Sequence, residues 1–352
     1  MKISKITSAL LLGALLGTNL SADILIINEP NTENLALNAA WDKTFKKDDN
    51  ILHKKVIFKN RYGISLAADL YVPRVADTGV KLPAVAISGP FGAVKEQASG
   101  LYAQELAKRG FVTLAFDPSY TGESGGMPRN IASSDINTED FSAAVDFLGI
   151  QNFVNSEKIS ILGICGFGGF ALNAGAMDTR IYKIVTSTMY DMSRVNAKGY
   201  NDSIDKEGRA QMKRDLNALR FDDAKNSTPS PSMNKLPEKL NGSEPKFVAD
   251  YFNYYKTQRG FHPRSINSNS AWSATTSLAL ANMPLLAYAG EISTPVLVIH
   301  GQNAHSRYFS EDAFRLLKGE NKELFIVPNA THTDLYDDKK KIPFDKIENF
   351  LK

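Results

Sequence analysis

The sequence predicts an α/β fold, with a mostly parallel β-sheet covered by helices on both faces. Short apolar runs without alternation are separated by segments with helical spacing, which is the pattern of buried parallel strands joined by helical crossovers. The 352 residues are 43% hydrophobic and 22% charged, as in a folded protein with a large core. We expect one large α/β domain with an insertion, although two ordinary domains would also fit this length.

The first 22 residues read as a signal peptide. Lys2 and Lys5 precede an apolar stretch at residues 6–16, and the sequence Leu20-Ser21-Ala22 suits a cleavage point. Because the apolar stretch is too short to span a bilayer, we expect export to the periplasm or the extracellular space, with a short uncleaved anchor as the alternative. Residues 23–50 show little periodicity and are expected to form an arm over the domain.

The domain is expected to begin with an antiparallel hairpin. Two strand-like runs, at residues 55–58 and 66–71, flank the turn residues Asn60-Arg61-Tyr62-Gly63. Strand and helix patterns then alternate. Further strands are expected at residues 84–88, 111–116, 159–163 and 184–187, and helices at 95–109, 138–149 and 166–177.

The α/β pattern is interrupted at residues 196–285, which we interpret as a cap made of helices and loops before the penultimate strand. This stretch contains a charged helical piece at 206–219, a linker rich in Ser and Pro at 227–232 and an aromatic stretch at 247–255. The pattern then resumes with strands at 295–300 and 323–327, a helix capped by Ser310 and a last helix from about residue 344. The α/β domain is therefore expected to comprise residues 51–195 and 286–352.

Composition limits the kind of site. A single Cys excludes a disulfide framework and any metal centre held by several thiolates. The net charge of +3 is too small to indicate a nucleic-acid surface, and no stretch after the leader predicts stable membrane insertion. Gly122, Gly125 and Gly126 lack the spacing of a phosphate-binding loop. We expect a small-molecule substrate, no metal and no cofactor, and the oligomeric state is not indicated.

Cys165 stands at the junction between an apolar strand and a helix rich in small residues. The local sequence is Gly163-Ile164-Cys165-Gly166-Phe167-Gly168-Gly169, in which glycines let a strand and a helix approach closely through a tight turn. Unpaired N–H groups at the helix start would stabilise a thiolate and a developing oxyanion. These features suit a nucleophile, and the alternative is an inert, buried Cys in a packing turn.

Four features together resemble the α/β-hydrolase fold: the turn around Cys165, the turn at residues 88–92, the loop at 117–124 and the late Ala330-Thr331-His332. A Cys in the central turn resembles the dienelactone hydrolase-like branch, which uses Cys, His and Asp. The similarity covers about residues 50–195 and 285–352. It implies cleavage of an activated carbonyl in an ester, lactone or thioester through an acyl-enzyme. The alternatives are a non-catalytic ligand- or protein-binding module and a redox-responsive thiol.

His332 is the expected general base, because the resemblance places the base in the loop after the last strand. Paired with His332, Cys165 would have a depressed pKa. His305, in the loop after the penultimate strand, is a candidate substrate contact. The remaining histidines are expected to be structural: His53, His262 and His300.

The acid that should orient His332 is absent from its usual place, because no carboxylate follows Gly301 before Glu311. Asp191, which follows an earlier strand, is our candidate for that acid. Asp334 is the rival, with a helix N-cap as its alternative role, and an amide could also hold the ring, supplied by Gln302 or Asn303.

The oxyanion donors are expected to be the backbone N–H of Gly166 and one from Phe91 or Gly92. In the cap, Tyr251 and Tyr255 belong to an aromatic stripe with helical spacing. The stripe favours lid packing, with substrate contact as the alternative reading. Glu96 is expected to stabilise the first turn of a helix.

Overall fold

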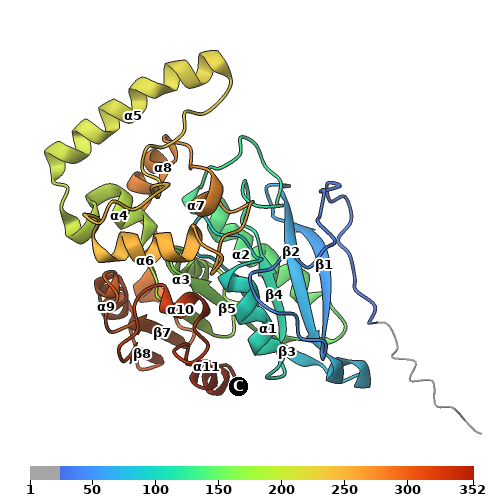
Figure 1. Cartoon of the computed structure of the whole chain (residues 1–352). Coiled ribbons are helices and arrows are strands. Elements are labelled where there is room, and N and C mark those ends of the chain that lie inside the picture. Colours follow the sequence, from blue (N-terminus) through green and yellow to red (C-terminus); the bar gives the residue numbers. More distant parts are fainter. Residues whose placement is uncertain (1–23) are drawn as a thin grey trace, which may run out of the picture.

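A computed structural model describes residues 24–352 and shows an eight-stranded sheet (Figure 1). The strand order is β1-β2-β4-β3-β5-β6-β7-β8. The first pairing, β1 with β2, and the next, β2 with β4, are antiparallel, and all other pairings are parallel. The strands are β1 (Ile51–Lys59), β2 (Ser65–Pro73), β3 (Leu82–Ser88), β4 (Val112–Phe116), β5 (Val154–Ile164), β6 (Ile184–Ser187), β7 (Val296–Gly301) and β8 (Lys322–Val327).

Helices cover both faces of the sheet, because the strands are apolar on both sides. In β3, Val85 and Ile87 belong to one buried cluster while Ala84 and Ala86 belong to the other. The first cluster is closed by α1 (Ala98–Ala107) and α11 (Phe344–Leu351), and the second by α2 (Ser134–Gly149), α3 (Phe167–Met177) and α9 (Arg307–Leu316). The predicted fold class, an α/β-hydrolase fold, is confirmed.

Further helices lie between β6 and β7, where the sequence predicts a cap. They are α4 (Met192–Lys198), α5 (Lys206–Asn226), α6 (Lys246–Tyr255), α7 (Ile266–Asn269) and α8 (Thr276–Asn282). Figure 1 shows α5 standing away from the body of the molecule, and no residue of α5 is buried. By contrast, Tyr254 and Tyr255 of α6 are buried within the cluster that includes α1, so α6 forms part of the core.

The start of α9 differs from the prediction. The helix begins at Arg307, with Ser306 in the N-cap position, so Ser310 lies inside the helix and not at its cap. The Ser310 hydroxyl is 2.6 Å from Nδ1 of His300 on β7. The sequence pattern does not indicate that the Ser310 hydroxyl forms a hydrogen bond with the buried ring of His300.

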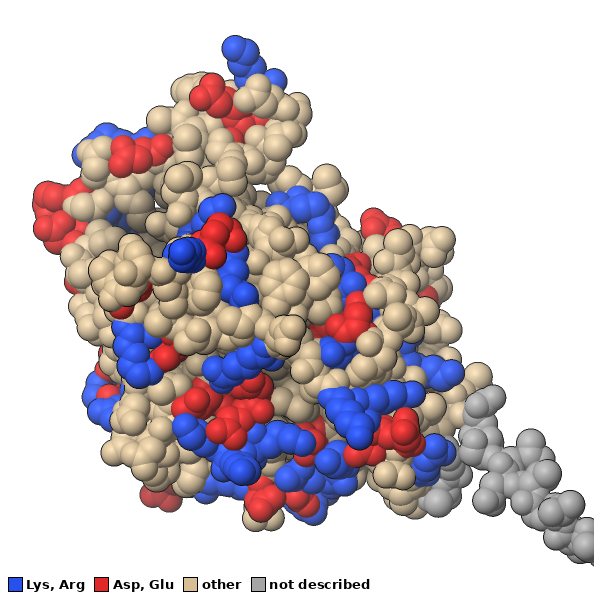
Figure 2. All heavy atoms as spheres, in the orientation of Figure 1, with Lys and Arg blue, Asp and Glu red and all other residues tan. Residues whose placement is uncertain are grey.

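Charged side chains are mixed on the face shown in Figure 2, where Lys and Arg alternate with Asp and Glu and form no single-sign patch. Within residues 24–352, no helix has the length and apolar character needed to cross a membrane. The predicted leader, residues 1–22, lies outside the described residues.

Candidate functional site

Cys165 occupies the sharp turn between β5 and α3, as its sequence context predicts. Its φ is +54°, a left-handed conformation that a non-glycine residue adopts only where the surrounding structure enforces it. The glycines beside it leave no room for side chains. A Cβ on Gly163 would lie 2.2 Å from the Phe167 carbonyl oxygen, and one on Gly166 would lie 2.6 Å from Cβ of Phe91. The turn therefore depends on glycines that let α3 and the Phe91 turn pack closely.

The thiol of Cys165 is buried, and burial raises its pKa. Three hydrogen bonds act in the opposite direction, from the Tyr336 hydroxyl and from the backbone N–H groups of Gly166 and Phe91. The prediction of a depressed pKa is wrong, because desolvation outweighs these donors.

The backbone donors of Gly166 and Phe91 are the expected oxyanion pair. Gly92, the other candidate donor, contributes its carbonyl oxygen instead, which accepts from the Ser265 hydroxyl at 2.9 Å. A Cβ on Gly92 would lie 2.5 Å from the Asn267 side chain. Gly92 therefore permits the close approach of the cap to this turn.

His332 lies after β8 and is 2% exposed. Its Nε2 is 3.0 Å from the Tyr336 hydroxyl, so Tyr336 stands between the imidazole and the thiol of Cys165. Its Nδ1 is 2.6 Å from the Ser306 hydroxyl and 2.9 Å from that of Thr188. Burial lowers the pKa of His332 well below its usual value.

The structure does not bring Asp191 to His332, which corrects the predicted triad. Asp191 is the N-cap of α4, where its carboxylate accepts from the backbone N–H of Arg194 at 3.0 Å and from the Ser193 hydroxyl. A short polar side chain at a helix start is drawn to the unpaired N–H groups there.

The other candidates for orienting His332 are occupied elsewhere too. Asp334 is the first residue of α10 (Asp334–Asp337), and its carboxylate accepts from the Thr331 backbone N–H at 2.8 Å and from Lys341 at 2.6 Å. The Gln302 side chain accepts from the backbone N–H of Asn329 at 3.0 Å. The backbone N–H of Asn303 donates to the Ala330 carbonyl, and the hydrogen bonds of the His332 ring go to hydroxyl groups and not to the Asn303 amide. The groups beside Nδ1 of His332 are the hydroxyls of Ser306 and Thr188, neither of which the sequence pattern indicates.

A cavity of about 650 Å³ opens at Cys165, and its lining is rich in aromatic side chains. Phe91 and Trp272 stack in its wall with ring centroids 4.1 Å apart. Both predicted cap residues, Tyr251 and Tyr255, line this cavity, together with further aromatic residues: Tyr190, Tyr200, Phe247 and Tyr336. A carbonyl substrate would thus meet an apolar wall above a thiol with two backbone donors.

His305 lines a second cavity of about 460 Å³ beside the first, together with His332. Its ring stacks on Phe247 at 4.4 Å, and its Nε2 bonds the Tyr190 hydroxyl. His305 therefore lines the second cavity while contacting Tyr190 and Phe247 in the wall of the first, and its contact with substrate stays a prediction.

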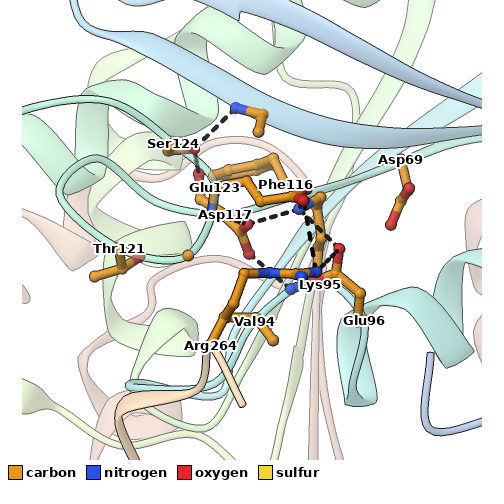
Figure 3. A network of polar contacts seen from close by, with 12 residues as sticks. Asp69, Val94, Lys95, Glu96, Phe116, Asp117, Thr121, Glu123, Ser124 and Arg264 are labelled. Carbon is orange, nitrogen blue, oxygen red and sulfur yellow. Dashed lines mark hydrogen bonds and ion pairs between the residues drawn. The ribbon is translucent and has the colours of Figure 1, made fainter. Parts of the chain in front are cut away.

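A buried network of charges surrounds Lys95, which follows the turn that carries Phe91 in the chain, and Figure 3 shows this network. Lys95 is fully buried, and its ammonium group lies 2.7 Å from Asp117, 2.9 Å from Glu96 and 2.6 Å from Glu123. Burial acts to lower the pKa of Lys95, but the surrounding carboxylates outweigh it and the pKa is raised. Lys95 also donates its backbone N–H to Asp117 at 2.8 Å. This bond fixes the chain just after residues 88–92, the turn that carries Phe91 (hereafter the Phe91 turn).

Glu96 belongs to this network, which corrects its predicted role at a helix start. Helix α1 begins at Ala98, with Gln97 at its N-cap position, and Glu96 instead pairs with Arg264 of the cap at 2.9 Å. A signal was present in the sequence, because Asp117 directly follows one buried strand and Lys95 lies in the loop after the neighbouring one, and such loops meet at one edge of a parallel sheet.

The cap also forms hydrogen bonds directly to the Phe91 turn. Asn267 donates its side-chain N–H to the Phe91 carbonyl oxygen at 2.8 Å, and its backbone N–H to that of Gly92 at 3.1 Å. The Ser265 hydroxyl also donates to the Gly92 carbonyl oxygen. Residues before and within α7 therefore fix the Phe91 turn, whose Phe91 N–H is directed at the thiol.

Comparison with known proteins places the chain in a family. A family model, the X-Pro dipeptidyl-peptidase (S15 family), matches residues 62–334. An uncharacterised protein of Pseudomonas aeruginosa is 58% identical over 320 residues, covering 90% of this chain and 85% of that protein. The crystal structure of a hypothetical protein from the same species has a TM-score of 0.88 at 57% identity, covering 91% of this chain and 99% of the other.

More distant relatives share the fold and include hydrolases. A thiohydrolase of Aspergillus aculeatus is 31% identical over 141 residues, 40% of this chain and 43% of that protein. The crystal structure of an α/β hydrolase from Penicillium covers 85% of this chain and 98% of its own with a TM-score of 0.71 at 20% identity. Esterases from Exiguobacterium antarcticum and Pyrococcus furiosus also appear among the structural neighbours. The chain therefore belongs to the X-Pro dipeptidyl-peptidase (S15) family of α/β hydrolases.

Proposed function

We propose that this protein is an exported, Cys-dependent hydrolase that cleaves an ester, lactone or thioester through an acyl-enzyme on Cys165. The observation that carries the proposal is the position of the thiol, in a strained turn with the N–H groups of Gly166 and Phe91 directed at it and an aromatic cavity above it. The similarity to a thiohydrolase and to esterases supports the same reaction type. The use of Cys resembles the dienelactone hydrolase-like branch.

The neighbouring hydroxyl and imidazole can remove the thiol proton. The S–H proton of Cys165 moves to the Tyr336 oxygen while the Tyr336 proton moves to Nε2 of His332, so Tyr336 stays neutral. Sulfur then bonds the carbonyl carbon, and the N–H groups of Gly166 and Phe91 stabilise the oxyanion. As the oxyanion collapses, the leaving group takes the proton back from His332 through Tyr336. Water then attacks the acyl thioester and gives its proton to His332 through Tyr336. The C–S bond breaks, the acid leaves, and the Cys165 sulfur takes the proton back from His332 by the same route.

The lining of the main cavity favours a neutral acyl group over a peptide N-terminus. Among the described residues that line it there is no Asp or Glu, and Lys235 is the charged one. A peptidase that releases X-Pro dipeptides must hold a terminal ammonium group, which is costly to bury without a carboxylate. A thiolate is also a better leaving group than an amine, so the tetrahedral adduct of an amide would tend to expel Cys165 again.

Hydrolysis of acyl p-nitrophenyl esters and acyl thioesters by the mature protein tests the proposal. Wild type should turn over both, Cys165→Ala should lose at least 100-fold in kcat (on the order of a lost nucleophile), and His332→Ala should lose activity with little change in KM. Met177→Ala is the matched control, because Met177 is an exposed residue at the end of α3, the helix that follows Cys165. Its kcat and KM should equal those of wild type. The absence of turnover with any chain length, together with tight binding of the same acyl compounds, would favour the binding-module alternative.

Export is tested separately from catalysis. Expression of the full chain in a bacterium should yield a periplasmic or extracellular product whose N-terminus, by Edman or mass analysis, follows Ala22. A cytoplasmic product that retains Met1 would contradict export while leaving the hydrolase proposal intact.

A further inference from the structure

A chain of buried hydroxyl and imidazole groups extends from the far side of the His332 ring. Nδ1 of His332 is 2.6 Å from the Ser306 hydroxyl, and this hydroxyl is 2.9 Å from Nε2 of His300. Nδ1 of His300 is in turn 2.6 Å from the Ser310 hydroxyl. Thr188 supports the same junction, with its hydroxyl 2.9 Å from Nδ1 of His332. All of these residues are buried.

The order of donors and acceptors along this chain can fix the tautomer of His332. If Nε2 is to accept a proton, Nδ1 must carry its own hydrogen and donate it to a hydroxyl oxygen. Ser306 can accept this hydrogen and donate its own to Nε2 of His300. The remaining N–H of His300 then donates to Ser310. Every group in the chain is satisfied while His332 stays neutral.

The Ser306 hydroxyl has no competing role in its helix. Ser306 occupies the N-cap position of α9, yet its side chain makes no capping hydrogen bond there, although serine at this position usually does. Its hydroxyl is instead turned inward to His332 and His300. The Ser306 side chain therefore contacts the two histidines and does not cap its helix.

No carboxylate in residues 24–352 pairs with His332. Asp191 and Asp334, the sequence candidates, are held by a helix start and by Lys341. The titratable groups that face the ring come from five different segments: Tyr190, Tyr251, His300, His305 and Tyr336.

We propose that Ser306 and His300 are positioning residues that replace the acid of the triad. They hold the His332 ring and its tautomer but supply no negative charge to stabilise an imidazolium. This inference rests on the proposed function, because it assigns the partner of the proposed base. It implies that the resting pair is a neutral thiol and a neutral imidazole, since a carboxylate at Nδ1 is what normally favours the charged pair.

Alkylation of Cys165 by iodoacetamide tests the proposal without requiring hydrolysis, because Cys165 is the single cysteine of the chain. The rate is measured from pH 6 to 11, because burial raises the pKa of the wild-type thiol, alongside kcat and KM for an acyl thioester. Ser306→Asp, which installs a carboxylate at Nδ1 of His332, should move the midpoint of alkylation at least one pH unit lower. Ser306→Ala should lower kcat about tenfold or more, the scale of losing an orienting hydrogen bond, at nearly unchanged KM, and Ser306→Thr should restore most of it.

Asp191→Asn is the matched control, since Asp191 is the acid that the sequence suggests but the structure places elsewhere. It should leave the pH dependence of alkylation and of kcat unchanged. The proposal is overturned if Asp191→Asn shifts these profiles, or if Ser306→Ala and Ser306→Asp both fold as wild type and leave them unchanged. If no variant or wild type hydrolyses any substrate, the hydrolase function fails, and the alkylation profiles still decide whether Ser306 orients His332.

Discussion

The hydroxyl of Tyr336 lies 3.0 Å from Nε2 of His332 and also bonds the thiol of Cys165. A tyrosine thus occupies the place where a nucleophile and its base would normally touch. Burial raises the pKa of Tyr336 well above its usual value, so in the proposed reaction this residue would pass a proton as a neutral phenol without ionising. The proposed base would reach the proposed nucleophile through it.

Replacing Tyr336 with Phe should interrupt this route. Because the remaining gap between Cys165 and His332 lacks a proton carrier, we expect kcat for an acyl thioester to fall about 100-fold, within the usual range for proton-transfer groups. Steady-state kinetics measures this. Tyr254→Phe is the control, since Tyr254 is also buried and packs 5.0 Å from the Tyr336 ring, but its hydroxyl lies outside the route from Cys165 to His332. A faster Tyr336→Phe enzyme would show that the hydroxyl blocks a direct contact.

The buried histidines should make the protein less stable in mild acid. Burial lowers the pKa of His300 to about 3 and that of His305 to about 4, whereas in the unfolded chain both titrate near 6.5. Their neutral forms fit the fold, so the free energy of unfolding is at its full value above about pH 6.5 and decreases as the pH falls toward 4. Each ring accounts for about 1.4 kcal/mol per pH unit in this window.

Urea unfolding at several pH values between 4.5 and 7 measures this dependence. His300→Gln, which cannot take up a proton, should give a shallower decrease than wild type, although it is less stable at pH 7. An equal slope in the two proteins would contradict the buried neutral state of His300.

Lys95 should be essential for folding stability. Its removal in Lys95→Met leaves Asp117, Glu96 and Glu123 without their central cation, and breaking a buried ion pair costs about 3–5 kcal/mol. Chemical denaturation should detect this. Lys47→Met is the control, because Lys47 is half exposed and lies 4.0 Å from Asp49, and it should change stability by less than about 1 kcal/mol. Similar effects of the two substitutions would contradict the account of the network.

Asn267, a residue of the cap, should align the Phe91 turn. Without its hydrogen bond to the Phe91 carbonyl oxygen, the Phe91 N–H would be less well aligned. Removing an oxyanion donor outright costs about 10²–10³ in kcat, so we expect misalignment alone to lower kcat about tenfold. The stability of the fold should be unchanged. The comparison is Asn267→Ala against Asn269→Ala, which alters an exposed residue of the same short helix. Equal kinetics for both variants would show that the cap does not align this turn.

The sequence predicted the fold and the turn around Cys165 because both depend on local pattern. Continuously apolar strands and glycines around one Cys are visible in the order of residues. The partners of His332 were not predictable in this way. Thr188 follows β6 and Ser306 precedes α9, and hydroxyls of this kind are common at the ends of strands and helices. Only the packing of β6 beside β7 brings both to one imidazole nitrogen.

The pKa of Cys165 was predicted in the wrong direction for a related reason. A helix start and a nearby His suggest a stabilised thiolate, but the sequence does not show how completely the aromatic residues of the cap exclude water. Tyr251 and Tyr255 come from α6, in a segment without strand pattern, and lie over the site only because the cap folds back onto the sheet.

Trapping of the acyl-enzyme tests the central claim most directly. Wild-type protein is mixed with an acyl p-nitrophenyl ester, quenched in acid within one turnover and analysed by intact and peptide mass spectrometry. We predict one acyl group per chain, located on the peptide that contains Cys165, released by neutral hydroxylamine and absent from Cys165→Ala. Acylation of a different residue, or full hydrolytic turnover by Cys165→Ala, would contradict the claim that Cys165 is the nucleophile.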